Sequence, residues 1–234
     1  MNSRDPNVVM MELVADRLGE GLREEFVFVG GAVAGLLITD PAQPAIRPTE
    51  DVDLIVSAVV RADYHRVEKA LRQLGFVNDI SIDAPICRWR IEKVTVDVMP
   101  TLKEILGFSN RWYPLALETA QRFLLPSGIS IRLIAAPLFL ATKFEAFADR
   151  GQNDYLFSHD LGDLISVVDG RNELIDECRG HGDELKDYLR TWTRALLEKP
   201  AFLDALPGHL PGDAASQARL PDLENKLRVL AGIS

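Results

Sequence analysis

Three aspartates in two short segments are the residues of this chain best suited to chemistry. Asp51 and Asp53 lie in the segment TEDVDLIV, and Asp97 lies in VTVDV. Alternation of apolar and polar residues is typical of a half-buried strand, on which side chains two apart point to the same face. Asp97 joins the other two if its strand pairs beside theirs. Clustered carboxylates repel one another, and hard oxygen ligands favour a divalent cation, Mg²⁺ or Mn²⁺.

A pair of glycines precedes the first of these segments. Gly30 and Gly31 follow the short apolar stretch 26–29 and precede residues 32–37, which have helical character. A strand, two glycines and a helix start let backbone amides approach a phosphate closely. A Gly-Gly turn by itself more often reflects plain turn geometry. The Asp-x-Asp segment that follows within one βαβ-sized unit makes phosphate binding the favoured interpretation.

Together these motifs resemble the nucleotidyltransferase superfamily with the polymerase-β-like fold. A later helix and acidic segment are similar to those of AbiEii-type nucleotidyltransferases, many of which are toxins of toxin–antitoxin pairs. The resemblance covers roughly residues 25–170 and rests on Gly30-Gly31, Thr49-x-Asp51-x-Asp53, Asp97, Lys143 to Arg150, and Asp160-x-x-Asp163. The chain departs from the pattern in residues 41–48, expected as an extra loop, and in Ser158-His159, where relatives often carry a basic residue.

The resemblance implies transfer of a nucleoside monophosphate from a nucleoside triphosphate (NTP) to an acceptor, with release of pyrophosphate. Such displacements use two metal ions about 3.5–4 Å apart. Asp51 and Asp53 would hold the metal at the triphosphate, and Asp97 would complete a second metal site or act as general base. Asp160 would orient or deprotonate the acceptor. The residues implied to bind the nucleotide are Gly30, Gly31, Thr49, Lys143 and Arg150.

Several of these residues have a purely structural alternative. Lys143 and Arg150 are nearly two helical turns apart on a partly apolar face, where a basic side chain commonly extends to water. Asp160 could cap the start of a helix. Thr49 could serve only at the start of a strand.

Charge and composition bound the partners. The net charge of −9 argues against a chain coated in nucleic-acid-binding surface, but residues 61–150 contain 13 basic and 10 acidic residues. Within this stretch Arg88-Trp89-Arg90 and Arg111-Trp112-Tyr113 combine guanidinium groups with aromatic rings, which can bind phosphates and stack on bases. The structural alternative is that the first segment is part of an alternating strand and that the second is the start of a helix.

Bulk properties predict a soluble cytoplasmic protein without membrane association. The chain has 234 residues, of which 47% are hydrophobic, enough for a substantial core. No stretch approaches eighteen apolar residues, and the N-terminus lacks the pattern of a secretory signal. Cys87 and Cys178 are too few for a disulfide framework or a zinc site.

The periodicity predicts an α/β (α+β) fold, with a mixed sheet over residues 1–134 followed by a helical C-terminal domain over 135–234. The resemblance implies that the first part is a polymerase-β-like nucleotidyltransferase core. A hairpin is expected across Glu92-Lys93, and residues 200–221 read as a tail rich in proline and glycine. Helices are expected at 7–22, 62–74, 115–123, 138–150, 160–168, 171–179 and 183–198, and strands at 26–29, 49–56, 80–82, 86–91, 95–99 and 129–134.

The main functional hypothesis is an Mg²⁺-dependent nucleotidyltransferase that uses an NTP. Its acceptor would be RNA, including tRNA, or a protein, and an antitoxin protein would be its partner if it is a toxin. One alternative is a small-molecule nucleotidyltransferase of the antibiotic-modifying type. Another is an inactive nucleotide-binding or partner-binding protein.

Overall fold

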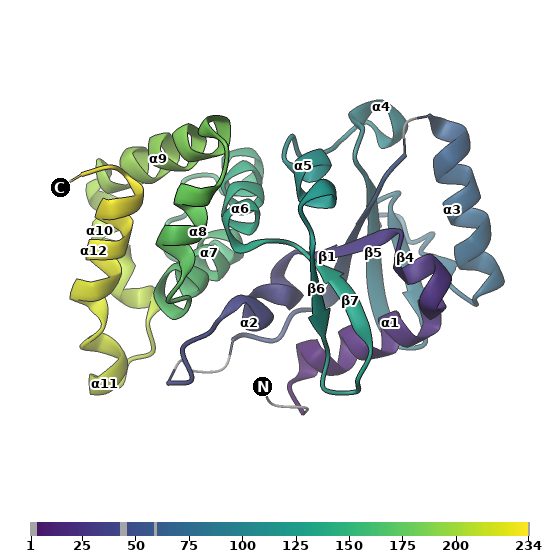
Figure 1. Cartoon of the computed structure of the whole chain (residues 1–234), viewed down its shortest axis with the longest axis horizontal. Coiled ribbons are helices and arrows are strands. Elements are labelled where there is room, and N and C mark those ends of the chain that lie inside the picture. The colour runs from purple at the N-terminus through teal and green to yellow at the C-terminus, as the bar shows by residue number, and fades with distance from the viewer. Residues whose placement is uncertain (1–3, 43–45, 59, 234) are drawn as a thin grey trace. The chain divides into compact units, whose positions relative to one another are not determined.

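The structure is a computed structural model that describes residues 4–42, 46–58 and 60–233. The chain forms two compact units (Figure 1): one comprises Met1–Val33 with Arg47–Ala135, and the other comprises Ala34–Ile46 with Ala136–Ser234. Residues 34–46, expected in the first domain, therefore cluster with the second unit. No helix in the described part of the chain is long and apolar enough to cross a membrane.

A mixed sheet forms the centre of the first unit, as the sequence predicts, but two of its seven strands, over residues 77–78 and 121–124, were not expected. Its strand order is β3-β4-β5-β2-β1-β7-β6, with β2–β5 and β1–β7 parallel and the other neighbours antiparallel. The fully buried β1 lies centrally, which fits its uninterrupted apolar sequence FVFV. The strands are β1 (Phe26–Val29), β2 (Asp51–Val56), β3 (Val77–Asn78), β4 (Arg88–Ile91), β5 (Val94–Pro100), β6 (Gln121–Leu124) and β7 (Ser130–Leu133).

Helices support this sheet. Helix α1 (Pro6–Arg23) begins at the N-cap Asp5 and packs on β2, β5 and β7 through apolar residues such as Met11 and Val14. Helix α3 (Arg61–Gln73) is anchored by Tyr64, whose hydroxyl donates to the carbonyl of Val98 at 2.7 Å. The shorter elements are η1 (Gly31–Val33), α4 (Lys103–Leu106) and α5 (Tyr113–Glu118).

The second unit is helical (green to yellow in Figure 1, with α2 from earlier in the chain). Helix α6 packs on α7, α8 and α9, and α12 packs on α7 and α9. The ring of Phe144 on α6 stacks on Trp192 of α9 at 5.8 Å between centroids. The elements are α2 (Ala34–Leu37), α6 (Ala136–Arg150), α7 (His159–Gly170), α8 (Leu174–Gly180), α9 (Asp183–Leu197), α10 (Pro200–Ala205), η2 (Leu206–His209), α11 (Ala214–Gln217) and α12 (Leu220–Leu230).

Hydrogen bonds tie residues 37–40 to the C-terminal end of α7 and to Arg171, which follows it. The amides of Thr39 and Asp40 both donate to the carbonyl of Gly170, at 3.0 and 2.9 Å. The guanidinium of Arg171 donates to the carbonyl of Leu37 at 2.6 Å. The segment thus satisfies polar groups at the C-terminal end of α7, which a helix leaves without intrahelical partners. Residues 43–45 of the expected loop 41–48 lie outside the described residues.

Three expected elements differ from the structure. Residues 80–82 form no strand: Ile80 and Ile82 are 93% and 101% exposed, and Asp79 accepts a hydrogen bond from the amide of Ser81 in a local turn. The helix expected over 115–123 ends at Glu118, because β6 pairs with β7 from Gln121. The expected tail 200–221 is largely helical, and its buried residues include Phe202 and Leu206.

Candidate metal and nucleotide site

The three aspartates come together on adjacent parallel strands. Asp53 of β2 lies directly opposite Asp97 of β5, and Asp51 lies on the same strand two residues before Asp53. One carboxylate oxygen from each residue lies within 4.8 Å of the other two. The strand of Asp97 therefore pairs beside the strand of Asp51 and Asp53, which the sequence analysis required for Asp97 to join the cluster. An all-carboxylate set of oxygen donors at this spacing fits a hard divalent cation such as Mg²⁺.

Gly30 makes room for one of these carboxylates. Its φ angle is +73°, and a Cβ atom at this position would lie 1.8 Å from Oδ2 of Asp53 and 2.5 Å from its Cγ. Only glycine fits here, because Asp53 occupies the space that a side chain would need. Gly30 therefore allows the Asp53 carboxylate to enter the cluster, in addition to the phosphate contact predicted for it.

The cluster contains an arginine that the sequence interpretation did not place there. Arg88 of β4 donates from Nε and Nη2 to the two oxygens of Asp97, at 2.9 and 2.7 Å. The same Nη2 lies 3.2 Å from Oδ2 of Asp51. A detectable signal existed, since the hairpin expected across Glu92-Lys93 puts Arg88 opposite Asp97 in its register.

The carboxylates raise the pKa values of neighbouring groups. The hydrogen bond with Asp97 is the main reason that the pKa of Arg88 is raised, so its guanidinium stays charged. Burial, followed by the charges of Asp97 and Asp53, raises the pKa of the Cys87 thiol to about 12. Cys87 therefore stays a protonated, buried thiol, as does the buried Cys178, whose pKa burial also raises to about 12.

The other residues expected near the triphosphate in the first unit have structural contacts. Gly31 is buried and begins the short η1 helix. The backbone amide of Thr49 donates to Oδ1 of Asn7 at 2.8 Å, and its hydroxyl lies 3.0 Å from the carbonyl oxygen of Asp51. These contacts hold the chain at the entry to β2. The structural alternative for Thr49 is thus realised, and a nucleotide contact by its hydroxyl stays a prediction.

A second charged cluster lies within the helical unit. Lys143 of α6 donates to Oδ1 of Asp160 and Oδ2 of Asp163 on α7, at 3.0 and 2.7 Å. Arg150 donates to both oxygens of Asp160, at 2.7 and 2.9 Å. The four residues are therefore joined by ion pairs, which the sequence analysis did not predict.

Ion pairs outweigh burial in setting the protonation of this cluster. Burial alone would lower the pKa of Lys143, but Asp163 and Asp160 outweigh it, so the pKa is raised. Burial alone would raise the pKa of Asp160, but Arg150 and Lys143 outweigh it, so the pKa is lowered. Both groups remain ionised at neutral pH.

Two structural alternatives for this cluster are wrong. The side chain of Lys143 does not extend to water, because it is only 8% exposed and is held by two carboxylates. Asp160 is not the N-cap of α7. That place is taken by Ser158, whose hydroxyl accepts from the amide of Leu161, while Asp160 is turned toward Lys143 and Arg150.

The tryptophans of the two basic–aromatic segments are unsuited to stacking on bases. Trp89 is completely buried and Trp112 is 3% exposed. Their rings are also contacted by arginines of this chain, Arg72 over Trp89 at 5.2 Å and Arg111 over Trp112 at 5.0 Å. The structure favours the alternative of strand and helix-start residues for the two tryptophans, so these two rings are no evidence for an RNA acceptor.

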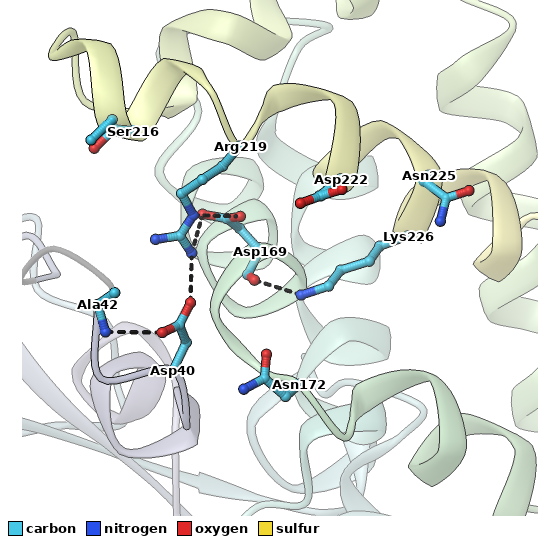
Figure 2. A pocket seen from close by; sticks show the side chains of 10 residues that line it. Asp40, Ala42, Asp169, Asn172, Ser216, Arg219, Asp222, Asn225 and Lys226 are labelled. Carbon is cyan, nitrogen blue, oxygen red and sulfur yellow. Dashed lines mark hydrogen bonds and ion pairs between the residues drawn. The ribbon is translucent and has the colours of Figure 1, made fainter.

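The helical unit contains a pocket of about 540 Å³, lined by none of the predicted site residues. Figure 2 shows the side chains that line it. Arg219 reaches from the wall between the carboxylates of Asp169 and Asp40, at 3.0 and 3.4 Å. Lys226 donates to the carbonyl of Asp169 at 2.6 Å, and its pKa is lowered, chiefly by burial. Arg219 and Lys226 therefore already have partners in the pocket wall, and their positive charges do not indicate an anionic ligand.

No protein-family model matches the chain, and no curated protein sequence matches it significantly. Among solved structures, the chain is similar to an antigenic nucleotidyltransferase-like protein from Paracoccidioides brasiliensis. The TM-score is 0.52 and the identity 21%, over 88% of this chain and 94% of that chain. The structure of JHP933 from Helicobacter pylori aligns over 96% of this chain and 90% of that chain, with 13% identity and a TM-score of 0.45, a likeness too distant to add to the argument.

The similarity to the Paracoccidioides brasiliensis structure bears on the fold. The fold is nucleotidyltransferase-like, which confirms the predicted fold class; an identity of 21% shows the fold alone. The finer resemblance to AbiEii-type enzymes stays a prediction.

Proposed function

We propose that this protein is an Mg²⁺-dependent nucleotidyltransferase. The observation that carries the proposal is the cluster of Asp51, Asp53 and Asp97 on paired strands of a nucleotidyltransferase-like fold. Such a concentration of negative charge is costly to build without a cation to neutralise it. Mn²⁺ has the same ligand preference and is the alternative ion.

Asp51 and Asp53 would hold the ion at the triphosphate, with Asp97 beside them, and the ion when bound supplies charge neutralisation on the triphosphate. The backbone amides at Gly30 and Gly31, with Thr49, would position the phosphates. In the transfer, an acceptor oxygen forms a bond to the α-phosphorus as the bond to the bridging oxygen of pyrophosphate breaks. The acceptor proton passes to a carboxylate, for which Asp97 or Asp160 is proposed.

Lys143 and Arg150 are proposed as ligands of the triphosphate. Because both are bound to Asp160 in the free protein, a nucleotide would have to compete with this carboxylate for them. Arg150 is the more accessible of the two, with a side chain that is 69% exposed compared with 8% for Lys143. We therefore expect Arg150 to respond first to a bound nucleotide.

The proposed acceptor is RNA, including tRNA, or a protein, and the proposed biological role is that of a toxin neutralised by an antitoxin protein in the cytoplasm. The similarity of the Lys143-to-Asp163 segment to AbiEii-type enzymes supports this choice. A small-molecule acceptor is the second candidate, favoured by the burial of Trp89 and Trp112, which leaves neither ring for stacking on RNA bases.

Labelling experiments separate these candidates. The protein is incubated with Mg²⁺ and each α-³²P-labelled NTP, in the presence of total RNA, a protein extract or an aminoglycoside. Label in RNA or protein supports the main proposal, and label only in the aminoglycoside supports the second candidate. Asp53→Asn should abolish labelling, while the control Asp83→Asn, which changes an exposed carboxylate outside the cluster, should not.

Calorimetry tests the inactive alternative. We expect at least one NTP to bind with Mg²⁺ at concentrations up to about millimolar, which corresponds to roughly 4 kcal/mol of binding free energy. If no NTP binds and no acceptor is labelled, the protein is not a nucleotidyltransferase, and a role in binding a partner protein takes its place.

A further inference from the structure

The position of Arg88 determines how much positive charge the aspartate cluster can still accept. Arg88 and Asp97 face each other directly across β4 and β5, so the backbone register brings their side chains together. The guanidinium engages both oxygens of Asp97 and also reaches Asp51. The fork geometry makes this pair stronger than a single contact between charges.

Charge balance limits the number of metal ions beside such a guanidinium. Three carboxylates carry three negative charges, and Arg88 together with one divalent ion neutralises all three. A second divalent ion would leave the cluster with two excess positive charges and would lie close to the guanidinium. Arginine cannot relieve this repulsion by losing its proton, because its pKa lies above about 12 even in water.

The burial of the pair indicates that Arg88 stays in place. The side chain of Asp97 is 11% exposed and that of Arg88 is 28% exposed. If Arg88 swung out to water, Asp97 would lose two charge-assisted hydrogen bonds in a largely buried position. Arg90, two residues further along β4, differs: its side chain is 62% exposed and its partner, at 3.0 Å, is Asp79 outside the cluster.

We propose that the site binds one divalent ion, held by Asp51 and Asp53, and that Arg88 takes the place of a second ion at Asp97. This inference rests on the proposed function, since it concerns the same carboxylates. Arg88 would then be a positioning residue that fixes Asp97 and supplies a permanent positive charge. The two-metal arrangement implied by the family resemblance would be replaced by one metal and one guanidinium.

Mn²⁺ titration of the intact protein tests this inference without an activity assay. The number of tightly bound ions is measured by calorimetry and by the loss of the free Mn²⁺ signal in electron paramagnetic resonance. The wild type should bind one ion and give an uncoupled spectrum. Arg88→Gln should bind two ions, and their spectrum should be spin-coupled, because ions that share carboxylates lie about 3.5–4 Å apart. Arg90→Gln, with the same change in charge on the same strand, should still bind one.

The outcomes distinguish this inference from the proposed function. Two coupled ions in the wild type, or one ion in a folded Arg88→Gln protein, would overturn the role of Arg88 and leave the enzyme proposal standing. An absence of ions in both proteins would overturn both. If Arg88→Gln does not fold by circular dichroism, Arg88→Met decides the question. It also removes the positive charge, so a second coupled ion is again expected, and its absence contradicts the inference.

Discussion

Gly30 and Asp53 compete for one volume: the position of a Cβ atom on Gly30 lies 1.8 Å from Oδ2 of Asp53. The glycine that would face a phosphate is therefore also the residue that permits a carboxylate to enter the cluster. This relationship makes the glycine testable through metal binding as well as through nucleotide binding.

Gly30→Ala should weaken Mn²⁺ binding by about tenfold or more, because a loss of 1.4 kcal/mol already gives that factor. The added methyl group must push the Asp53 carboxylate out of its place. Gly128→Ala is the matched control, since Gly128 also has a positive φ, +84°, but has open space where the methyl group would go. Both changes should cost similar backbone strain. Equal Mn²⁺ affinity in the two variants would contradict the role assigned to Gly30.

Asp97→Asn and Asp53→Asn should have different effects on the stability of the metal-free protein. Asp97→Asn weakens the pairing of Arg88 and should cost about 1–3 kcal/mol of unfolding free energy. Asp53→Asn removes repulsion between carboxylates and should leave the stability unchanged or slightly higher. Urea denaturation in the presence of a chelator measures both. A larger loss for Asp53→Asn than for Asp97→Asn would contradict the distribution of charge described for the cluster.

Lys143→Met should destabilise the protein by about 3–5 kcal/mol, because it leaves Asp160 and Asp163 buried with one cation fewer. Arg150→Met should cost less than about 1 kcal/mol, since the arginine is largely exposed and Lys143 still neutralises Asp160. Chemical denaturation at pH 7 compares the two. Equal losses of unfolding free energy would contradict this dependence of the buried cluster on Lys143. In that case a change in the KM for NTP in the Lys143 variant could be attributed to lost nucleotide binding and not to lost stability.

His209 should make the protein less stable in mild acid. Its Nε2 lies 2.7 Å from the carbonyl oxygen of Tyr155, and burial lowers its pKa below the ordinary value of 6.5. The folded state therefore favours the neutral ring, so its contribution to stability is complete above pH 6.5 and is lost as the pH falls toward the lowered pKa. Melting temperatures measured between pH 7 and 5 should decline less in His209→Gln than in the wild type. Parallel pH profiles would exclude His209 as the cause.

Asp160 should act in the same direction at lower pH. Its pKa in the folded protein lies below the ordinary value of 3.8, so its contribution is complete above that pH and is lost as the pH falls through the lowered pKa. The slope of unfolding free energy against pH below 4 should be shallower in Asp160→Asn. An unchanged slope would show that other carboxylates account for acid unfolding.

The carboxylate cluster could be predicted from sequence because its information is local. Alternation fixed which faces Asp51, Asp53 and Asp97 occupy, and the structure supplied the pairing of β2 with β5. Arg88 was missed although the hairpin register contains it, because its aromatic neighbour suggested a nucleic-acid surface. The sequence shows that Trp89 alternates with polar residues along a strand. It does not show that the face of the sheet on which Trp89 lies is covered, which is why the burial of Trp89 was not predicted.

The C-terminal helices were hidden by proline. Residues 200–221 were expected to be a tail because they are rich in proline and glycine, yet Pro200 and Pro221 both lie in the first turn of a helix, where a missing amide proton costs nothing. Ile80 and Ile82 mislead in the opposite direction, because their alternation imitates a strand while the chain there makes a polar turn. The C-terminal helices depend on packing partners elsewhere in the chain, and residues 80–82 form no strand because no neighbouring strand pairs with them. Neither fact can be read from the local sequence.

The assignment of residues 34–46 to the helical unit affects how the protein can be made. The ribosome synthesises this segment well before α7, so the amides of Thr39 and Asp40 must remain hydrated until the carbonyl of Gly170 has emerged. A fragment beginning at Ala136 would expose the C-terminal end of α7 and leave Arg171 without the carbonyl of Leu37. The helical unit would therefore be recovered in folded form only with residues 34–46 supplied, either as a separate peptide or joined through a circular permutation.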